Sequence, residues 1–283
     1  MNEQTLTGSP LSVAVAIIHD TFQEARARWL FWGLFALSSL LIGIFLFVMK
    51  IDVVEGAVSL MGMERTAHHV DIAAFVNQSY SWVSVFVYIW GTFLAIFASS
   101  GLIPSVLEPG RISLLLSKPV TRTALLLWRY VGNVAVVALN HLYLILSIWV
   151  IIGLKTNIWQ VRFLLAIPIS LFIFAVLLSV VVLIGVISES AALSVMVAVA
   201  LMLISTILAQ RQFVIRALSS EWSRELWMAF YWIVPKVYDL AGAMRQIILF
   251  DRDADLLMPV WTSALFGAVV LSSAVYLFRR RDF

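Results

Sequence analysis

Residues 163–188 of the chain read FLLAIPISLFIFAVLLSVVVLIGVIS and contain no Asp, Glu, Lys or Arg. The hydrocarbon core of a membrane is about 30 Å thick, so a helix needs about 20 apolar residues to cross it. A charge at the centre of such a helix costs at least about 2.5 kcal/mol on insertion. This stretch is therefore predicted to be a membrane-spanning helix.

Five further charge-free runs are long enough to cross, which predicts an all-α membrane protein. Polar residues 77–81 are expected to approach the membrane ahead of the second span. The third span is expected to begin before Arg129, whose long side chain can carry its guanidinium to the headgroups. Pro168 is expected to kink the fourth span and Pro259 to start the sixth. The predicted spans are 30–49, 83–104, 124–153, 163–188, 190–210 and 257–278.

The composition of the 283 residues agrees with this class, because 62% are hydrophobic and only 12% are charged. A soluble domain carries about 25% charged residues. The mean hydropathy is +1.00. A soluble enzyme, a disordered chain and a nucleic-acid module are therefore excluded, the last because the 19 Lys and Arg residues are scattered along the chain rather than clustered.

Residues 1–29 are predicted to form a separate amphipathic helix ahead of the membrane domain, residues 30–283. Asp20, Glu24 and Arg28 lie one helical turn apart, and Glu24 is placed to pair with Arg28. We expect this helix to lie on the cytoplasmic membrane surface; a helix packed on a soluble partner is the alternative. Its apolar stripe recurs at helical spacing through Leu11, Val15, Ile18, Phe22, Ala25 and Trp29.

The distribution of Lys and Arg predicts the orientation in the cell (inner) membrane. Basic residues are dense between the second and third spans and in Arg279, Arg280 and Arg281, whereas residues 211–257 balance theirs with as many acidic ones. Both termini are therefore expected in the cytoplasm. The outer segments are 50–81 and 211–255, and the latter is expected to hold two short re-entrant helices separated by Pro235.

Several chemistries are missing from the sequence. There are no cysteines, and no Gly-x-x-x-x-Gly-Lys phosphate loop occurs, so any ATP and Mg²⁺ must be bound by another chain. We expect no enzyme activity and no cofactor in this chain alone. A metal site built from Glu64, His68, His69 and Asp71 is weighed against a solvated loop patch, which we favour.

Asn140 and His141 lie near the middle of the third span, where a titratable side chain is a candidate for a transport pathway. A neutral histidine that bonds to a neighbouring helix is the competing interpretation. An intramembrane enzyme would need a second catalytic group at this depth, so we predict no catalytic residues.

The connection between the second and third spans contains a compact apolar helix with charged ends. Pro109 suits a first helical turn, and Pro119 disfavours helix at the residue before it. Thr121 is predicted to cap the third span. Rigid junctions would join this short helix to two membrane helices, so a push on it would move both.

Residues 110–127 read GRISLLLSKPVTRTALLL, which resembles the permease subunits of type-2 ABC transporters, the ABC-2 family. The C-terminal FRRRDF, the six spans and the N-terminal helix are similar too. Pro109 departs from the family pattern and leaves the start of the helix open.

The resemblance implies that two permeases, identical or related, bind two cytoplasmic ATPase subunits and move a substrate outward. Residues 108–118 would be the coupling helix, although its charges are also explained by the positive-inside bias alone. The alternative function is a non-transporting scaffold, or mechanotransmitter, that acts on an extracytoplasmic partner. The implied contacts are Ile112, Leu115 and Leu116 as the apolar face, with Glu108, Arg111, Lys118 and Arg122 as polar anchors.

Overall fold

The structure is a computed structural model. The residues that it describes are 10–52, 57–60, 63–64, 72–101, 104–107, 110, 121–211, 214, 220–250 and 255–281.

Six helices in the described part of the chain are long and apolar enough to cross a membrane, which confirms the predicted number. They run over Trp29–Phe47, Ala73–Ser100, Arg122–Thr156, Val161–Ser188, Ala191–Ala209 and Leu257–Arg280. The named helices are α1 (Pro10–Ala27), α2 (Trp29–Gly43), α3 (Ile72–Phe86), α4 (Thr92–Ser100), α6 (Arg122–Thr156), α7 (Ala166–Ser188), α8 (Ala191–Ala209), α10 (Glu221–Ile233), α11 (Val237–Phe250) and α12 (Leu257–Arg280).

Short non-α turns complete several of these helices. A π-helical turn, Ile44–Val48, extends α2, and a second, Val87–Gly91, joins α3 to α4 into one continuous span. Turns of 3₁₀ helix occupy Pro104–Leu107, after α4, and Val161–Leu165, before α7. Because α7 begins at Ala166, Pro168 lies in its first turn, where a missing backbone N–H costs nothing.

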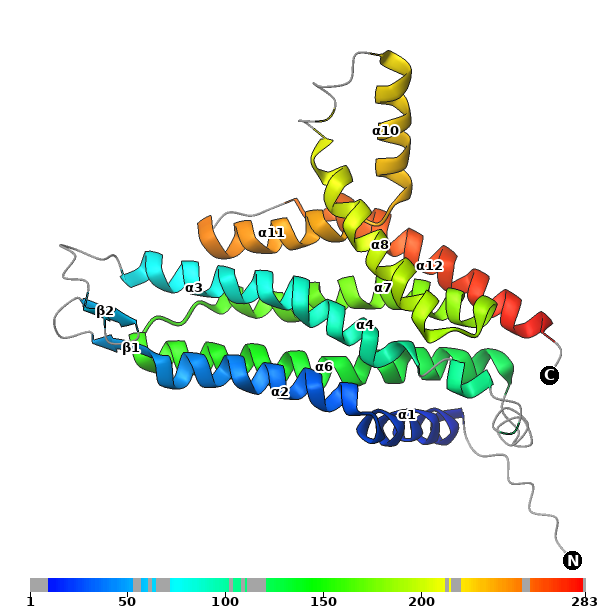
Figure 1. Cartoon of the computed structure of the whole chain (residues 1–283), viewed down its shortest axis with the longest axis horizontal. Helices are drawn as coiled ribbons and strands as arrows, with labels where there is room; N and C mark the ends of the chain where they lie inside the picture. The colour runs from blue at the N-terminus through cyan, green and yellow to red at the C-terminus, as the bar shows by residue number, and fades with distance from the viewer. Residues whose placement is uncertain are drawn as a thin grey trace, which may run out of the picture.

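One small antiparallel sheet adds to the helical membrane body, and the sequence did not predict it. Its strands are β1 (Met49–Asp52), β2 (Ala57–Leu60) and β3 (Met63–Glu64), in the order β1-β2-β3. Met49 pairs with Leu60, and Ser59 pairs with Glu64. The sheet lies at the end of the bundle opposite α1 (Figure 1).

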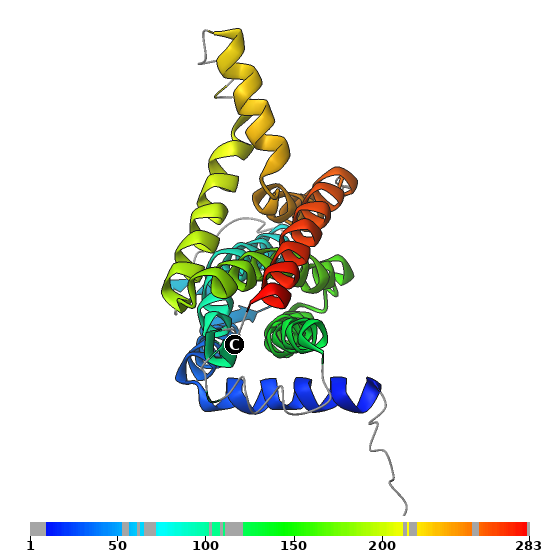
Figure 2. The same cartoon turned by 90° about the vertical axis from the view of Figure 1, so that its right-hand side faces the viewer.

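Helix α1 crosses the bundle end beneath α2 and α6 (Figure 2). Its protein-facing side is formed by the small residues Ala14, Thr21 and Ala25 together with Ile17. The predicted apolar stripe is split between the two sides: Val15 and Trp29 are exposed, Ile18 and Phe22 are half-buried, and Ala25 is buried. Small residues let two helix backbones approach closely, so they make the contact with α6, and the larger apolar side chains remain available to lipid.

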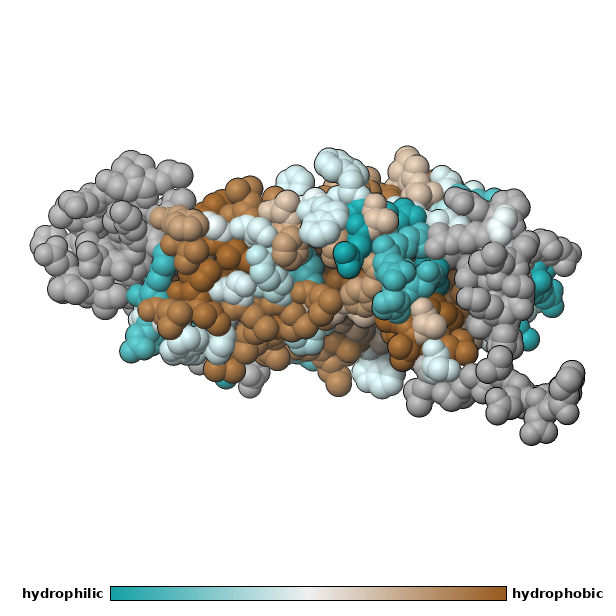
Figure 3. All heavy atoms as spheres, turned by 90° about the horizontal axis from the view of Figure 1, so that it is seen from below, coloured by the Kyte–Doolittle hydropathy of each residue, from teal (hydrophilic) through white to brown (hydrophobic). Residues whose placement is uncertain are grey.

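The outer surface of α2 and α6 is broadly apolar, and hydrophilic side chains gather toward the end where α1 lies (Figure 3). The ends of α1 and α12, the start of α6 and the end of α4 all lie at this same end of the bundle (Figure 1). With an even number of spans, the chain enters the first span and leaves the last span on the same side of the membrane.

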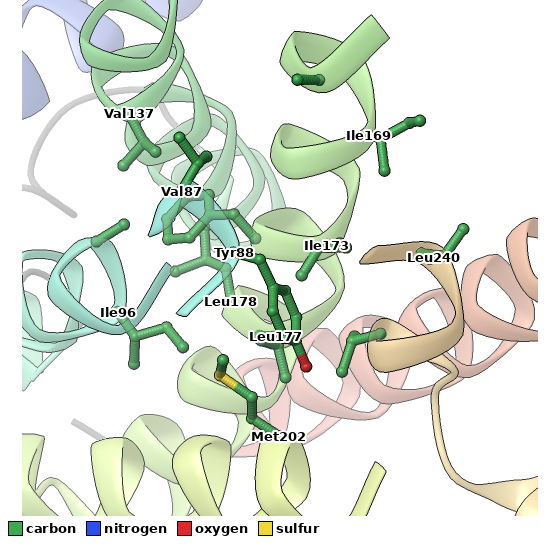
Figure 4. Close-up of a cluster of buried hydrophobic side chains, with 14 of the residues drawn as sticks. Val87, Tyr88, Ile96, Val137, Ile169, Ile173, Leu177, Leu178, Met202 and Leu240 are labelled. Atoms are coloured by element: carbon green, nitrogen blue, oxygen red, sulfur yellow. The ribbon is translucent and has the colours of Figure 1, made fainter. Parts of the chain in front are cut away.

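The core is centred on α7, which packs against α6, α8 and α12. Ile173, Leu177 and Leu178 of α7 are fully buried, and side chains from the second span, α8 and α11 converge on them (Figure 4). A helix that is apolar on every side belongs inside a bundle. The uniformly apolar residues 163–188 therefore provide the central helix as well as a span.

Candidate functional site

Most of the predicted coupling residues, Glu108, Arg111, Ile112, Leu115, Leu116 and Lys118, lie outside the described residues, as do Pro109 and Pro119. Apart from Gly110, the described chain stops at Leu107 and resumes at Thr121. The candidate site is therefore described by the contacts of the two segments that precede and follow the proposed coupling helix.

The flank that follows the coupling segment is the start of α6. Thr121 Oγ1 accepts a hydrogen bond from the Ala124 amide at 3.2 Å, which confirms the predicted cap. Arg122 donates to the backbone carbonyls of Arg279, at 3.4 Å, and Arg281. Arg281 in turn pairs with Glu189, at the end of α7. The start of the third span is thus tied to the chain beyond the sixth span and to α7.

Arg129 is the main correction to the sequence prediction, because its guanidinium is buried inside the protein against α1 and is not exposed at the surface of the bundle. Its side chain is only 1% exposed, and it forms ion pairs with Asp20 and Glu24 of α1, the latter at 2.7 Å. A buried charge is tolerated only when it is paired. Helix α1 supplies the two carboxylates, so the arginine has no need to extend to the membrane surface.

The flank that precedes the coupling segment meets the same cluster. Arg28 Nη2 bonds Glu24 Oε1 at 3.0 Å, which confirms the predicted pair, and it also donates to the carbonyl of Gly101 at 2.8 Å. Ser105 donates to Glu24 Oε1 at 2.6 Å. The pairing of Glu24 with Arg28 follows from their spacing in the sequence. The contacts with Ser105 and Gly101 do not, because no local pattern connects these residues to α1.

Asn140 and His141 are both buried in α6. Asn140 Nδ2 donates to Ser38 of α2 at 3.0 Å. His141 Nδ1 contacts the carbonyl of Val137, in its own helix, at 3.0 Å, so the predicted bond to a neighbouring helix is wrong for this nitrogen. An i−4 carbonyl is always within reach of a helical side chain of this length. A pathway role for either residue stays a prediction.

A comparison with protein families adds to this geometry. The model of the ABC-2 family transporter proteins matches residues 15–222, which covers the helices from α1 to α8 and both flanks of the coupling segment. The chain belongs to the ABC-2 transporter family. No individual curated protein matches it. Members of the family are normally non-catalytic, multi-pass membrane subunits, usually arranged as dimers, and they work with an ABC ATPase.

In this ABC-2 protein, a second polar cluster lies where the fifth span, α8, ends and the sixth span, α12, begins. As predicted, Pro235 separates two helices, α10 and α11. Two serines from different spans accept hydrogen bonds from backbone amides at the start of α11. Ser263 accepts from the amide of Lys236, just before the helix, at 2.9 Å, and Ser205 accepts from the amide of Tyr238 at 3.2 Å. The hydroxyls satisfy helix-terminal N–H groups that have no partner within α11. These two hydrogen bonds hold the start of α11 against α8 and α12.

The side chains around this turn include a buried cation. Lys236 is 2% exposed, and its ammonium donates to the Tyr231 carbonyl at 3.1 Å and lies over the Tyr231 and Trp232 rings. Tyr231 donates to Asp239 at 2.7 Å. Burial lowers the pKa of Lys236, and burial together with the Asp239 bond raises the pKa of Tyr231 to about 12. The phenol of Tyr231 therefore stays protonated, and able to donate to Asp239, to a higher pH than an ordinary tyrosine.

The candidate metal ligands between the first and second spans are not placed as a group. The side chain of Glu64 and the residues His68, His69 and Asp71 lie outside the described part of the chain. Among the residues that are described, no three His, Asp or Glu side chains gather as metal ligands would. The metal hypothesis of the sequence stays untested in this ABC-2 protein.

Proposed function

We propose that this chain is the permease subunit of an ABC transporter that exports its substrate, driven by ATP hydrolysed on a separate ATPase subunit. The family match over residues 15–222, in a chain with six candidate spans, carries the proposal. The sequence contains no Gly-x-x-x-x-Gly-Lys loop. ATP and Mg²⁺ are accordingly assigned to the partner subunit, and both termini of the permease to the cytoplasm.

Residues 108–118 are proposed as the coupling helix, seated on the ATPase. Ile112, Leu115 and Leu116 form its apolar contact, and Glu108, Arg111, Lys118 and Arg122 anchor its ends. The connection between Ser100, where α4 ends, and Arg122, where α6 begins, is longer than a plain turn between two helices needs, which supports this role. A displacement of such a segment acts on the second and third spans together.

A second permease, identical or related, is proposed to complete a central pathway, with Asn140 and His141 as candidate pathway residues. The charge-free span centres favour an apolar or amphipathic substrate, including lipid. A cluster of fixed charges would be expected if the substrate were a small ion.

The ATPase contact is tested by co-expressing the chain with its cognate ABC ATPase and purifying the complex in detergent. Exchanging Leu115 and Leu116 for Asp should abolish co-purification, since two carboxylates would be buried without partners in the groove. Leu114→Asp is the matched control, because at 100° per residue it lies on the opposite side of the helix. Equal retention of the ATPase by all variants would contradict the coupling assignment.

Transport is tested in vesicles that contain the intact complex and a fluorescent phospholipid as the probe. ATP-dependent movement of the probe between leaflets would support a permease for amphipathic cargo. A complex that hydrolyses ATP and moves neither this probe nor native vesicle lipids would favour the scaffold hypothesis instead.

A further inference from the structure

The carboxylate of Glu24 connects three segments that are far apart in the sequence. Its Oε2 accepts from Arg129 Nη1 on α6 at 2.7 Å, and its Oε1 accepts from Arg28 at 3.0 Å and from Ser105 at 2.6 Å. Glu24 is 12% exposed and Arg129 is 1% exposed, so the contacts are largely shielded from water. Charge-assisted hydrogen bonds of this kind are stronger than neutral ones.

Arg28 extends the cluster to the end of the second span. It donates to the carbonyl of Gly101, and the same carbonyl accepts the Ser105 amide at 3.2 Å. A Cβ at Gly101 would overlap the Arg28 guanidinium. The last turn of α4 and the turn that follows it are therefore held directly by the end of α1.

The contact between α1 and α6 is equally close. A Cβ on Gly132 would lie 2.9 Å from the Cβ and Oγ1 of Thr21, too close for a carbon atom in ordinary contact. Thr21 is fully buried, and its hydroxyl donates to the carbonyl of Ile17 at 2.8 Å within α1. The close contact between Thr21 and Gly132 thus fixes the position of α1 along the axis of α6.

These contacts lie on both sides of the proposed coupling helix. Gly101 and Ser105 precede residues 108–118, whereas Arg129 and Gly132 follow them. We propose that α1 is a strut that holds the two ends of the coupling segment together, with Glu24 as its positioning residue, so that a push from the ATPase moves the second and third spans as one body. The inference rests on the proposed function.

The competing explanation is that Glu24 only neutralises Arg129. The double variant Glu24→Met with Arg129→Met separates the two explanations. Replacing both members of a buried ion pair with apolar side chains of similar size often leaves stability unchanged. The double variant therefore removes the charges and the connection to Ser105 and Arg28 together, without stranding a buried charge.

The test measures three properties of the complete complex in liposomes: thermal stability, co-purification of the ATPase, and permease-dependent ATP hydrolysis. We expect the double variant to keep the first two and to lose about tenfold in the third, in the usual range for coupling between sites. Arg26→Met is the matched control, because Arg26 is an exposed charge on the same helix. The control should hydrolyse ATP as the wild type does.

A milder variant keeps the inference testable if the double variant does not fold. Ser105→Ala removes one hydroxyl from Glu24 and should lower permease-dependent hydrolysis several-fold without a change in melting temperature. Retention of full hydrolysis by folded Glu24→Met/Arg129→Met, or by Ser105→Ala, would overturn the strut. Loss of ATPase binding by the folded double variant would overturn it too, because the cluster would then serve docking. A wild-type chain that binds no ATPase would instead contradict the proposed function.

Discussion

Glu24 and Arg129 are 105 residues apart in the sequence, yet their side chains meet at 2.7 Å beneath the bundle. Arg129 is the largest of the fully buried side chains, and the carboxylates of α1 make its burial possible. The N-terminal helix is therefore part of the folded membrane domain and not an independent surface anchor.

This pair predicts a stability cycle that is independent of any ATPase. Glu24→Met alone should lower the free energy of unfolding by about 1–3 kcal/mol, because it leaves Arg129 with Asp20 as its remaining carboxylate. Adding Arg129→Met should recover most of this loss. Thermal unfolding in detergent measures both variants, and strictly additive losses would show that the two side chains do not interact.

The close seat of α1 on α6 predicts that Gly132→Leu displaces the helix. Its side chain would enter the space of Thr21, and overpacking of this kind costs about 1–3 kcal/mol. Limited proteolysis should then cut α1 from the membrane domain faster. Gly33→Leu serves as the control, since no atom lies within 4 Å of a Cβ there. Equal proteolysis of the two variants would contradict the docked position of α1.

The contact between Lys236 and Ser263 predicts a loss of stability when the Ser263 hydroxyl is removed. In Ser263→Ala the buried amide of Lys236 loses its acceptor, which should lower stability by about 1–3 kcal/mol. Ser273→Ala, in the same helix, removes a hydroxyl that is exposed and bonds only Val269 of its own helix. Melting temperatures compare the two, and a Ser273→Ala loss as large as that of Ser263→Ala would argue against this role.

The proposed orientation can be measured directly, because the native chain has no cysteine. Ser12→Cys on α1 should resist a membrane-impermeant maleimide in intact cells and react after the cells are opened. Ser220→Cys, before α10, should react in intact cells. Both positions are exposed in the structure. The reverse labelling pattern would place α1 and the coupling segment outside and remove the basis for ATPase contact.

The variant His141→Ala distinguishes a structural role of His141 from a role in the transport pathway. Because its Nδ1 is already satisfied by Val137, we expect His141→Ala to leave assembly and ATP turnover unchanged. Co-purification and hydrolysis measure these properties. A loss of turnover in an assembled complex would instead identify His141 as a pathway residue.

The sequence alone determined the features that depend on local composition. Charge-free runs such as 163–188 predicted six spans because the cost of placing a charge in hydrocarbon applies to each helix separately. The Thr121 cap, the Glu24–Arg28 pair and the break at Pro235 were predicted for a similar reason, since each depends on residues within one helical turn. The family match agrees with the resemblance found at residues 110–127.

Only the tertiary structure decided which faces of these helices meet. Arg129 was expected to reach the headgroups because nothing near it in the sequence marks Asp20 and Glu24 as partners. The buried face of α1 carries Ala14, Ile17, Thr21 and Ala25, and only Ala25 among them belongs to the apolar stripe that the sequence predicts. The packing between helices depends on the shapes of their surfaces and on the pairing of buried charges that are far apart in the sequence. The hydrophobic periodicity of one helix carries no information about either.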